Sequence, residues 1–120
     1  MNDLEQRTSD FAISVRWFIK SLPQTLANYE DVRQLIKSSG SLCANYIESN
    51  EALSKRDRMM RLKISRKEAK ETTFWISTIL KSNDLSSAVT QSGELLFKEA
   101  SELRNILSAI IIKTQTKDKS

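Results

Sequence analysis

The sequence predicts an all-α protein, folded as an antiparallel up-down-up-down left-handed four-helix bundle. Its 120 residues include only two glycines and one proline, so few positions interrupt a helix. Apolar residues recur three and four positions apart in four segments that short polar links separate. Short links make consecutive helices antiparallel, and the length suits one core. We therefore expect residues 1–120 to form a single four-helix-bundle domain.

The first helix is expected at about residues 3–21 because its apolar residues form one stripe. These are Leu4, Thr8, Phe11, Val15, Phe18 and Leu22. Pro23 then ends the helix, since the residue before a proline avoids the helical region. Ile13 and Trp17 lie off the stripe, one turn apart, as a second apolar patch. This patch is either a contact in an oligomer or a Trp lying over the edge of the bundle.

The second helix is expected at about residues 28–52, with Asn28 as its N-cap. Its predicted inward residues are Val32, Leu35, Ile36, Ser39, Cys43, Tyr46 and Ile47. Gly40 lies in the middle of this helix, where a residue without a side chain lets a neighbouring helix approach closely.

The third helix is expected at about residues 55–81, capped by Ser54, and the fourth at about 86–113, starting near Ser86 or Ser87. The third helix buries Met59, Leu62, Ala69, Thr72, Ile76, Ile79 and Leu80. The fourth buries Val89, Leu96, Ala100, Leu103, Ile106, Leu107 and Ile110. The polar residues 114–120 are expected to form a disordered tail.

The composition argues against an enzyme. The chain has no histidine and one cysteine, Cys43, so it lacks the residues for a zinc site, a Cys-His nucleophile pair or an internal disulfide. Gly-rich phosphate-binding loops are absent as well. We expect no catalytic residues, no metal and no cofactor.

Four polar residues on the second and third helices form a candidate cluster: Asn45, Glu48, Glu71 and Thr72. Antiparallel packing of the two helices is expected to bring Asn45 and Glu48 near Glu71. The four residues are interpreted as a polar network that fixes the register of the helices. A carboxylate site for a metal or for proton transfer is the alternative, although bundle metal sites of this kind also use histidine.

Positive charge is concentrated at the start of the third helix. The net charge is +4, from 19 Lys and Arg against 15 Asp and Glu. Arg56, Lys63, Lys67 and Lys70 follow one helical face, with Arg66 beside them. This stripe predicts a surface for RNA or DNA, and an ordinary solvated helix face is the alternative.

The chain lacks an apolar run of about 18 residues and a signal peptide. We therefore expect a cytoplasmic protein that does not bind membranes.

One set of segments extends over most of the chain: 11–23, 33–36, 41–45 with Glu48, 54–57, 67–75, which reads KEAKETTFW, and 99–103 with Ile110. In these segments the sequence resembles the bacterial family of four-helix-bundle proteins first seen encoded in intervening sequences of 23S ribosomal RNA. The resemblance implies a homopentameric ring without an established enzymatic activity, and it places the recurrent polar residues of the family at Asn45, Glu48 and Glu71. The chain is also similar to the accessory variability protein of diversity-generating retroelements, a basic pentamer that binds nucleic acid.

These observations together predict a non-enzymatic oligomeric scaffold that binds RNA or DNA through the third helix. The expected partners are further copies of the chain, as a pentamer, and nucleic acid. The alternative is a structural module, or one that binds another protein through Ile13 and Trp17, without nucleic-acid binding.

Overall fold

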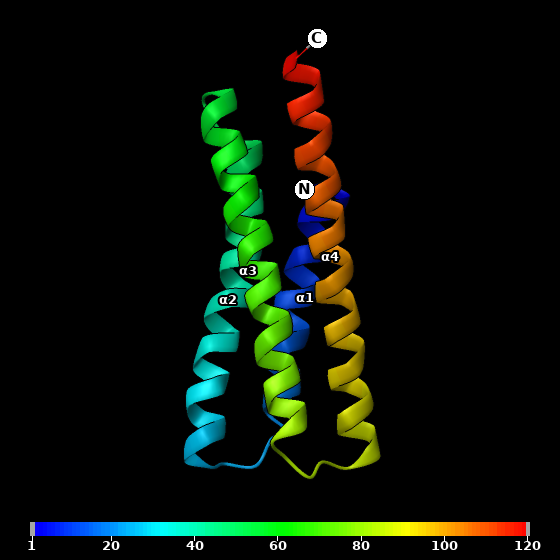
Figure 1. Ribbon diagram of the computed structural model, residues 1–120. Helices are drawn as coiled ribbons and strands as arrows, with labels where there is room; N and C mark the ends of the chain where they lie inside the picture. Colours follow the sequence, from blue (N-terminus) through cyan, green and yellow to red (C-terminus); the bar gives the residue numbers. More distant parts are fainter. Residues whose placement is uncertain (1, 120) are drawn as a thin grey trace.

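The computed structural model describes the backbone of residues 2–119 and the side chains of residues 2–117. Over this range the chain forms four α-helices and no strand (Figure 1). The helices are α1 (Asp3–Ile19), α2 (Leu26–Asn50), α3 (Lys55–Lys81) and α4 (Ser87–Lys119). The predicted all-α fold is confirmed, and each helix packs against the next, with α4 returning to α1.

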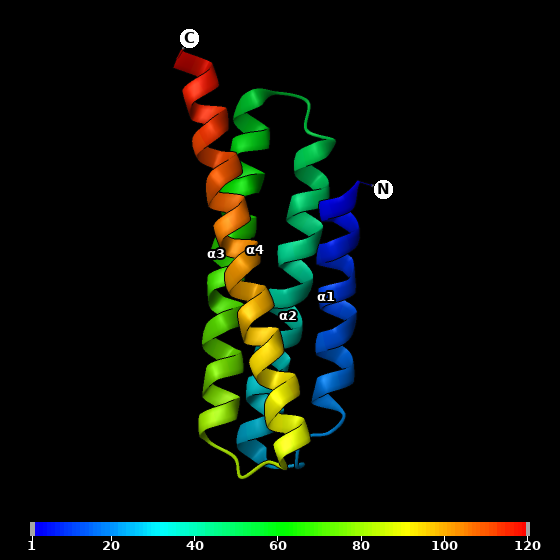
Figure 2. The same cartoon turned by 90° about the vertical axis from the view of Figure 1, so that its right-hand side faces the viewer.

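The molecule is an elongated rod of 52 × 23 × 20 Å. Figures 1 and 2 both show α1 beginning well short of the end at which α4 terminates. That end, called the distal end below, is built from the α2–α3 loop (51–54), the first turns of α3 and the last turns of α4. Only three helices therefore meet at the distal end.

The core follows the predicted stripes closely. Thr8, Phe11, Val15 and Phe18 of α1 are buried, as are Leu62, Ile76 and Ile79 of α3 and Leu96, Leu103 and Leu107 of α4. One residue outside the predicted inward face of α2, Leu42, is also completely buried. A helix with neighbours on two sides buries a wider sector than one narrow stripe.

The predicted N-cap of α3 and the predicted start of α4 are confirmed, and the predicted N-cap of α2 is wrong. Ser54 Oγ accepts a hydrogen bond from Asp57 N at 3.1 Å, and Ser86 Oγ accepts one from Val89 N at 3.2 Å. Thr25 caps α2 instead of Asn28, because Thr25 Oγ1 accepts from Asn28 N at 3.1 Å. The side chain of Asn28 is buried and takes part in a contact between two loops.

The C-terminus differs from the expectation of a disordered tail at 114–120. α4 continues to Lys119, and residue 120 lies outside the described residues. Ile111 is buried, and the hydroxyls of Thr114 and Thr116 donate to the carbonyls of Ile110 and Ile112. Since neither glycine nor proline follows Gly93, nothing in the sequence ends the helix earlier.

The close approach expected at Gly40 occurs at Gly93 instead. A Cβ on Gly40 would meet only Arg16 Nη2, at the ordinary distance of 3.7 Å. A Cβ on Gly93 would lie 2.5 Å from Leu80 Cδ2 and 3.1 Å from the ring of Phe18. Side chains from α1 and α3 therefore occupy the space left by the glycine of α4.

Candidate nucleic-acid interface

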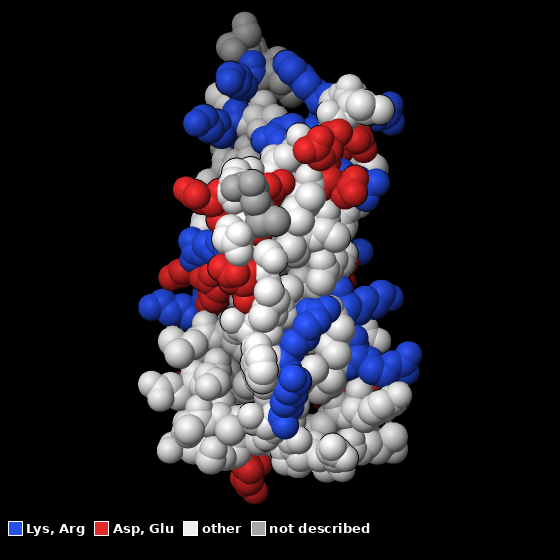
Figure 3. Space-filling model, turned by 180° about the vertical axis from the view of Figure 1, so that it is seen from behind, with Lys and Arg blue, Asp and Glu red and all other residues white. Residues whose placement is uncertain are grey.

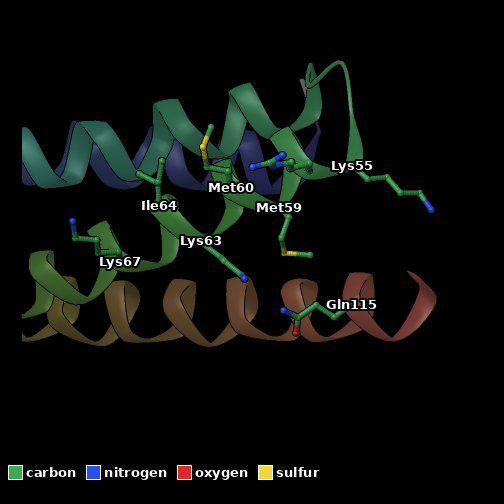
Figure 4. Close-up of a pocket in the computed structure, with 8 residues that line it drawn as sticks. Lys55, Met59, Met60, Lys63, Ile64, Lys67 and Gln115 are labelled. Atoms are coloured by element: carbon green, nitrogen blue, oxygen red, sulfur yellow. The ribbon is translucent and has the colours of Figure 1, made fainter. Parts of the chain in front are cut away.

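Three of the five predicted cations line an open groove of about 720 Å3 beside α3. Arg56, Lys63 and Lys67 lie on its wall because they are seven and four residues apart on one helix. The groove, called the basic groove below, is lined by Lys55, Arg56, Met59, Met60, Lys63, Ile64, Lys67 and Gln115. In Figure 4 the side chains of Met59 and Lys63 extend from α3 toward α4, which carries Gln115. Met60 and Ile64 extend from α3 in the opposite direction in this view. The lining of the basic groove thus combines cations with three apolar residues, Met59, Met60 and Ile64, which are together called the apolar floor below.

A second groove of about 670 Å3 lies beside the first at the distal end. Its lining includes Lys113 and Lys117 of α4 together with Arg58, and Lys55 lines both grooves. Sequence reasoning did not include Lys113 and Lys117: the last helix was expected to end at residue 113, which left Lys113 as its final residue and Lys117 outside it. Their i, i+4 spacing in a stretch without Gly or Pro was the signal that could have found them.

Figure 3 shows the face opposite to that of Figure 1. Lys and Arg lie near the end where α4 terminates and again around mid-height, with Asp and Glu between the two groups, and uncharged residues cover most of the lowest part of the view. On this face positive charge is therefore not confined to the distal end.

Two further arginines at the start of α3 are used to hold the bundle together. Arg58 Nη1 lies 3.3 Å from both the carbonyl oxygen of Ser49 and Asn50 Oδ1. Arg61 Nη1 donates to Asn45 Oδ1 at 3.1 Å. Both residues thereby tie α3 to the last turns of α2 and contribute less to a binding surface.

The remaining predicted cations, Arg66 and Lys70, lie outside the lining of the basic groove. Lys70 is exposed and Arg66 is half-buried. Glu68 and Glu71 lie on the same part of α3, and burial, followed by the negative charge of Glu71, raises the pKa of Glu68, whereas Lys67 and Lys37 act in the opposite direction. These carboxylates weaken the positive potential there, so it is strongest toward the start of α3.

The structure does not join Asn45, Glu48, Glu71 and Thr72 into one network. Glu48 and Glu71 are exposed, and Asn45 binds Ser41 and Arg61. Thr72 Oγ1 instead lies 2.9 Å from Ser38 Oγ. Small hydroxyls thus make the buried polar contacts between α2 and α3, including Ser65 Oγ to the carbonyl of Leu42 at 2.7 Å. Over the described residues, no group of three or more His, Cys, Asp or Glu is placed to hold a metal ion.

Ile13 and Trp17 are 52% and 65% exposed on α1. Trp17 lines a groove of about 370 Å3 between α1 and α4, opposite Val89 and Leu95. Lys20 Nζ lies 4.1 Å from the centre of the Trp17 ring, within cation–π range. Ile13 is outside that groove.

None of the helices in the described part of the chain is both long and apolar enough to cross a membrane.

Comparisons with known proteins agree with the fold. Among curated proteins, none matches the chain significantly. A solved structure from Bacteroides thetaiotaomicron, described as a protein with unknown function from the S23 ribosomal protein family, superimposes with a TM-score of 0.79. It is 24% identical, and the alignment covers 90% of this chain and 97% of that one, which supports the four-helix fold. Neither description names a catalytic activity. The sequence profile of the 23S rRNA-intervening sequence protein family matches residues 2–109, so this chain belongs to that family.

Proposed function

We propose that this protein is a non-enzymatic, oligomeric scaffold that binds nucleic acid through the basic groove. One observation carries the proposal: Arg56, Lys63 and Lys67 of α3 line one groove, and the adjoining groove, which shares Lys55, adds Lys113 of α4. Family membership is consistent with a nucleic-acid partner, since the description of the family names an intervening sequence of 23S rRNA.

Electrostatics favours phosphate as the ligand of this surface. Each phosphate that a Lys or Arg neutralises releases condensed counterions, and this release drives non-specific binding. A ring of several copies would repeat the positive surface and raise the local potential further. No chemical step is required of the cations, which is consistent with a scaffold.

Charge reversal with a matched control tests the proposal. The variant Arg56→Glu/Lys63→Glu/Lys67→Glu should lose binding to a labelled RNA in low-salt fluorescence anisotropy, because the groove then repels phosphate. The control Lys81→Glu/Lys98→Glu/Arg104→Glu changes net charge by the same amount at exposed sites away from the groove. It should retain most of the affinity. If both variants lost the same affinity for RNA, the loss would come from the change in net charge alone, which would contradict a localised binding site.

A second candidate function is protein binding through the face formed by α1 and α4. Trp17 and Leu95 are each more than 60% exposed and line the same apolar groove. This face is also the proposed contact between copies of the chain, together with Ile13. Trp17→Ser combined with Leu95→Ser should dissociate the assembly in light scattering, while Leu53→Ser, at a fully exposed loop position, should not. An unchanged molar mass in the double variant would show that the face formed by α1 and α4 is not the contact between copies of the chain.

A further inference from the structure

We infer that the basic groove takes unpaired nucleotides, with bases against the apolar floor and phosphates against the cations. The inference rests on the proposed function and specifies its ligand as single-stranded nucleic acid. The whole lining of the groove, including its uncharged residues, leads to this conclusion.

The lining of the groove also holds apolar surface that phosphates do not use. Met59, Met60 and Ile64 alternate with the cations along the sequence of α3, and Met60 is 49% exposed. A phosphate placed over a thioether or an Ile side chain loses water and gains no hydrogen bond. The face of a base, in contrast, gains from covering such a surface, and methionine adapts to flat partners.

A duplex cannot use this floor. Its bases are stacked and paired in the interior, so it presents phosphates, sugars and the narrow edges of bases. An unpaired strand can turn its bases inward and its phosphates outward, as in grooves that bind single strands. A lining that holds cations and the exposed apolar surface of Met60 can contact both parts of an unpaired strand.

The dimensions are sufficient for a short strand. From Lys55 to Lys67 the helix rises about 18 Å, at about 1.5 Å per residue. That length corresponds to about five stacked nucleotides at about 3.4 Å each. Gln115, on α4 at the other side of the groove, carries an amide that can both donate to and accept from the edge of a base.

The test compares four labelled ligands with the full-length protein at one ionic strength. They are a single-stranded oligonucleotide of about 12 nucleotides, the blunt duplex of the same sequence, a strand of equal length with abasic linkers, and an acidic peptide of equal charge. The single strand should bind at least about fivefold more tightly than any of the other three, because only it offers bases to the floor.

Substitution of Met60 tests the floor without altering charge. Met60→Ser should weaken single-strand binding about fivefold and leave the abasic strand unaffected, whereas Met60→Leu, which keeps an apolar surface, should bind like the original chain. Phe97→Ser provides a control at an exposed apolar residue of α4 outside the groove.

The outcomes separate the two proposals. Absence of binding to every nucleic acid would overturn the proposed function and this inference with it. Equal affinity for single strand, duplex and abasic strand would leave nucleic-acid binding in place and overturn the base-binding floor. Tighter binding of the acidic peptide would assign the groove to a protein partner instead.

Discussion

Gly93 is a residue of α4 at which side chains of other helices pack closely against the backbone. The space beside its Cα is filled by Leu80 of α3 and by Phe18 of α1, whose side chain is only 5% exposed. The glycine therefore costs helix propensity but permits this packing.

Replacing each glycine by alanine should have opposite effects. Gly93→Ala should destabilise the fold by about 1–2 kcal/mol, because the displacement of Leu80 and Phe18 outweighs the gain in helix propensity. In Gly40→Ala the added Cβ makes only an ordinary contact, so this substitution should stabilise the fold by about 0.5–1 kcal/mol. Urea unfolding measures both, and stabilisation by Gly93→Ala would contradict the observed packing.

Asn28 joins the two loops at the end opposite the distal end. Its side chain is 3% exposed, and Nδ2 donates to the carbonyl of Pro23 and to Asn83 Oδ1, both at 2.8 Å. Asn83 Nδ2 donates back to Asn28 Oδ1 at 2.8 Å. The α1–α2 and α3–α4 connections are thus fixed to each other.

Asn28→Ala should lower the free energy of unfolding by about 1–3 kcal/mol, because the substitution leaves buried polar groups without partners. The exposed Asn105 on α4 supplies the control, since Asn105→Ala should be neutral or slightly stabilising. Thermal unfolding of the two variants distinguishes these outcomes. Equal unfolding midpoints for the two variants would show that the contact between Asn28 and Asn83 contributes nothing to stability.

At the scale of elements, Arg7 connects α1 to α4. Its guanidinium donates to both carboxylate oxygens of Glu99, at 2.8 and 2.6 Å, and to Glu102 at 2.8 Å. Hydrogen bonding and the charge of Arg7 lower the pKa of Glu99, although burial acts in the opposite direction. The bidentate geometry makes this pair stronger than an ordinary surface ion pair.

The Arg7–Glu99 pair should make part of the stability dependent on pH. A carboxylate with a lowered pKa in the folded state stabilises above its unfolded pKa of about 4.3, and this contribution disappears as pH falls through the folded value. Glu99→Gln should therefore cost about 1 kcal/mol at pH ~7 and almost nothing at pH ~2. Urea unfolding at both pH values, with exposed Glu94→Gln as control, measures the difference. A loss that is the same at both pH values would exclude the ion pair as its cause.

Sequence patterns predicted the helices well and their ends less well. The spacing of Phe11, Val15 and Phe18 defines a buried stripe whatever the partner helix is. The cap of α2 was harder, because Thr25 and Asn28 both suit an N-cap and the contact with Asn83, 55 residues away, decides between them. The predicted end of α4 was wrong because the polar residues after 113 were interpreted as a tail, although no glycine or proline there ends the helix.

At the scale of the whole molecule, the cation stripe was predictable but the groove was not. Arg56, Lys63 and Lys67 share a face by spacing alone, whereas Gln115 joins them only through the register of α4 against α3. Likewise, Asn45 and Glu71 were expected to meet, but register and rotation leave Glu71 exposed. Long-range register is not encoded in the period of a single helix.

Placing several like charges on one face of α3 should carry a cost in stability. The neutral variant Arg56→Gln/Lys63→Gln/Lys67→Gln should unfold at the same temperature as the original chain or at a higher one at low salt, because repulsion is relieved. Differential scanning calorimetry at two salt concentrations measures this effect, which should shrink at high salt. A marked destabilisation would mean that these cations serve the fold rather than binding.

The salt dependence of single-strand binding tests the account most directly. If Arg56, Lys63 and Lys67 contact phosphates, the logarithm of the binding constant should fall with the logarithm of salt concentration at a slope of about −2, or more steeply. Lys63→Gln should reduce the magnitude of the slope by about 0.7, and Lys98→Gln should leave it unchanged. A slope near zero, or an equal change in the two variants, would contradict a phosphate-binding groove between α3 and α4.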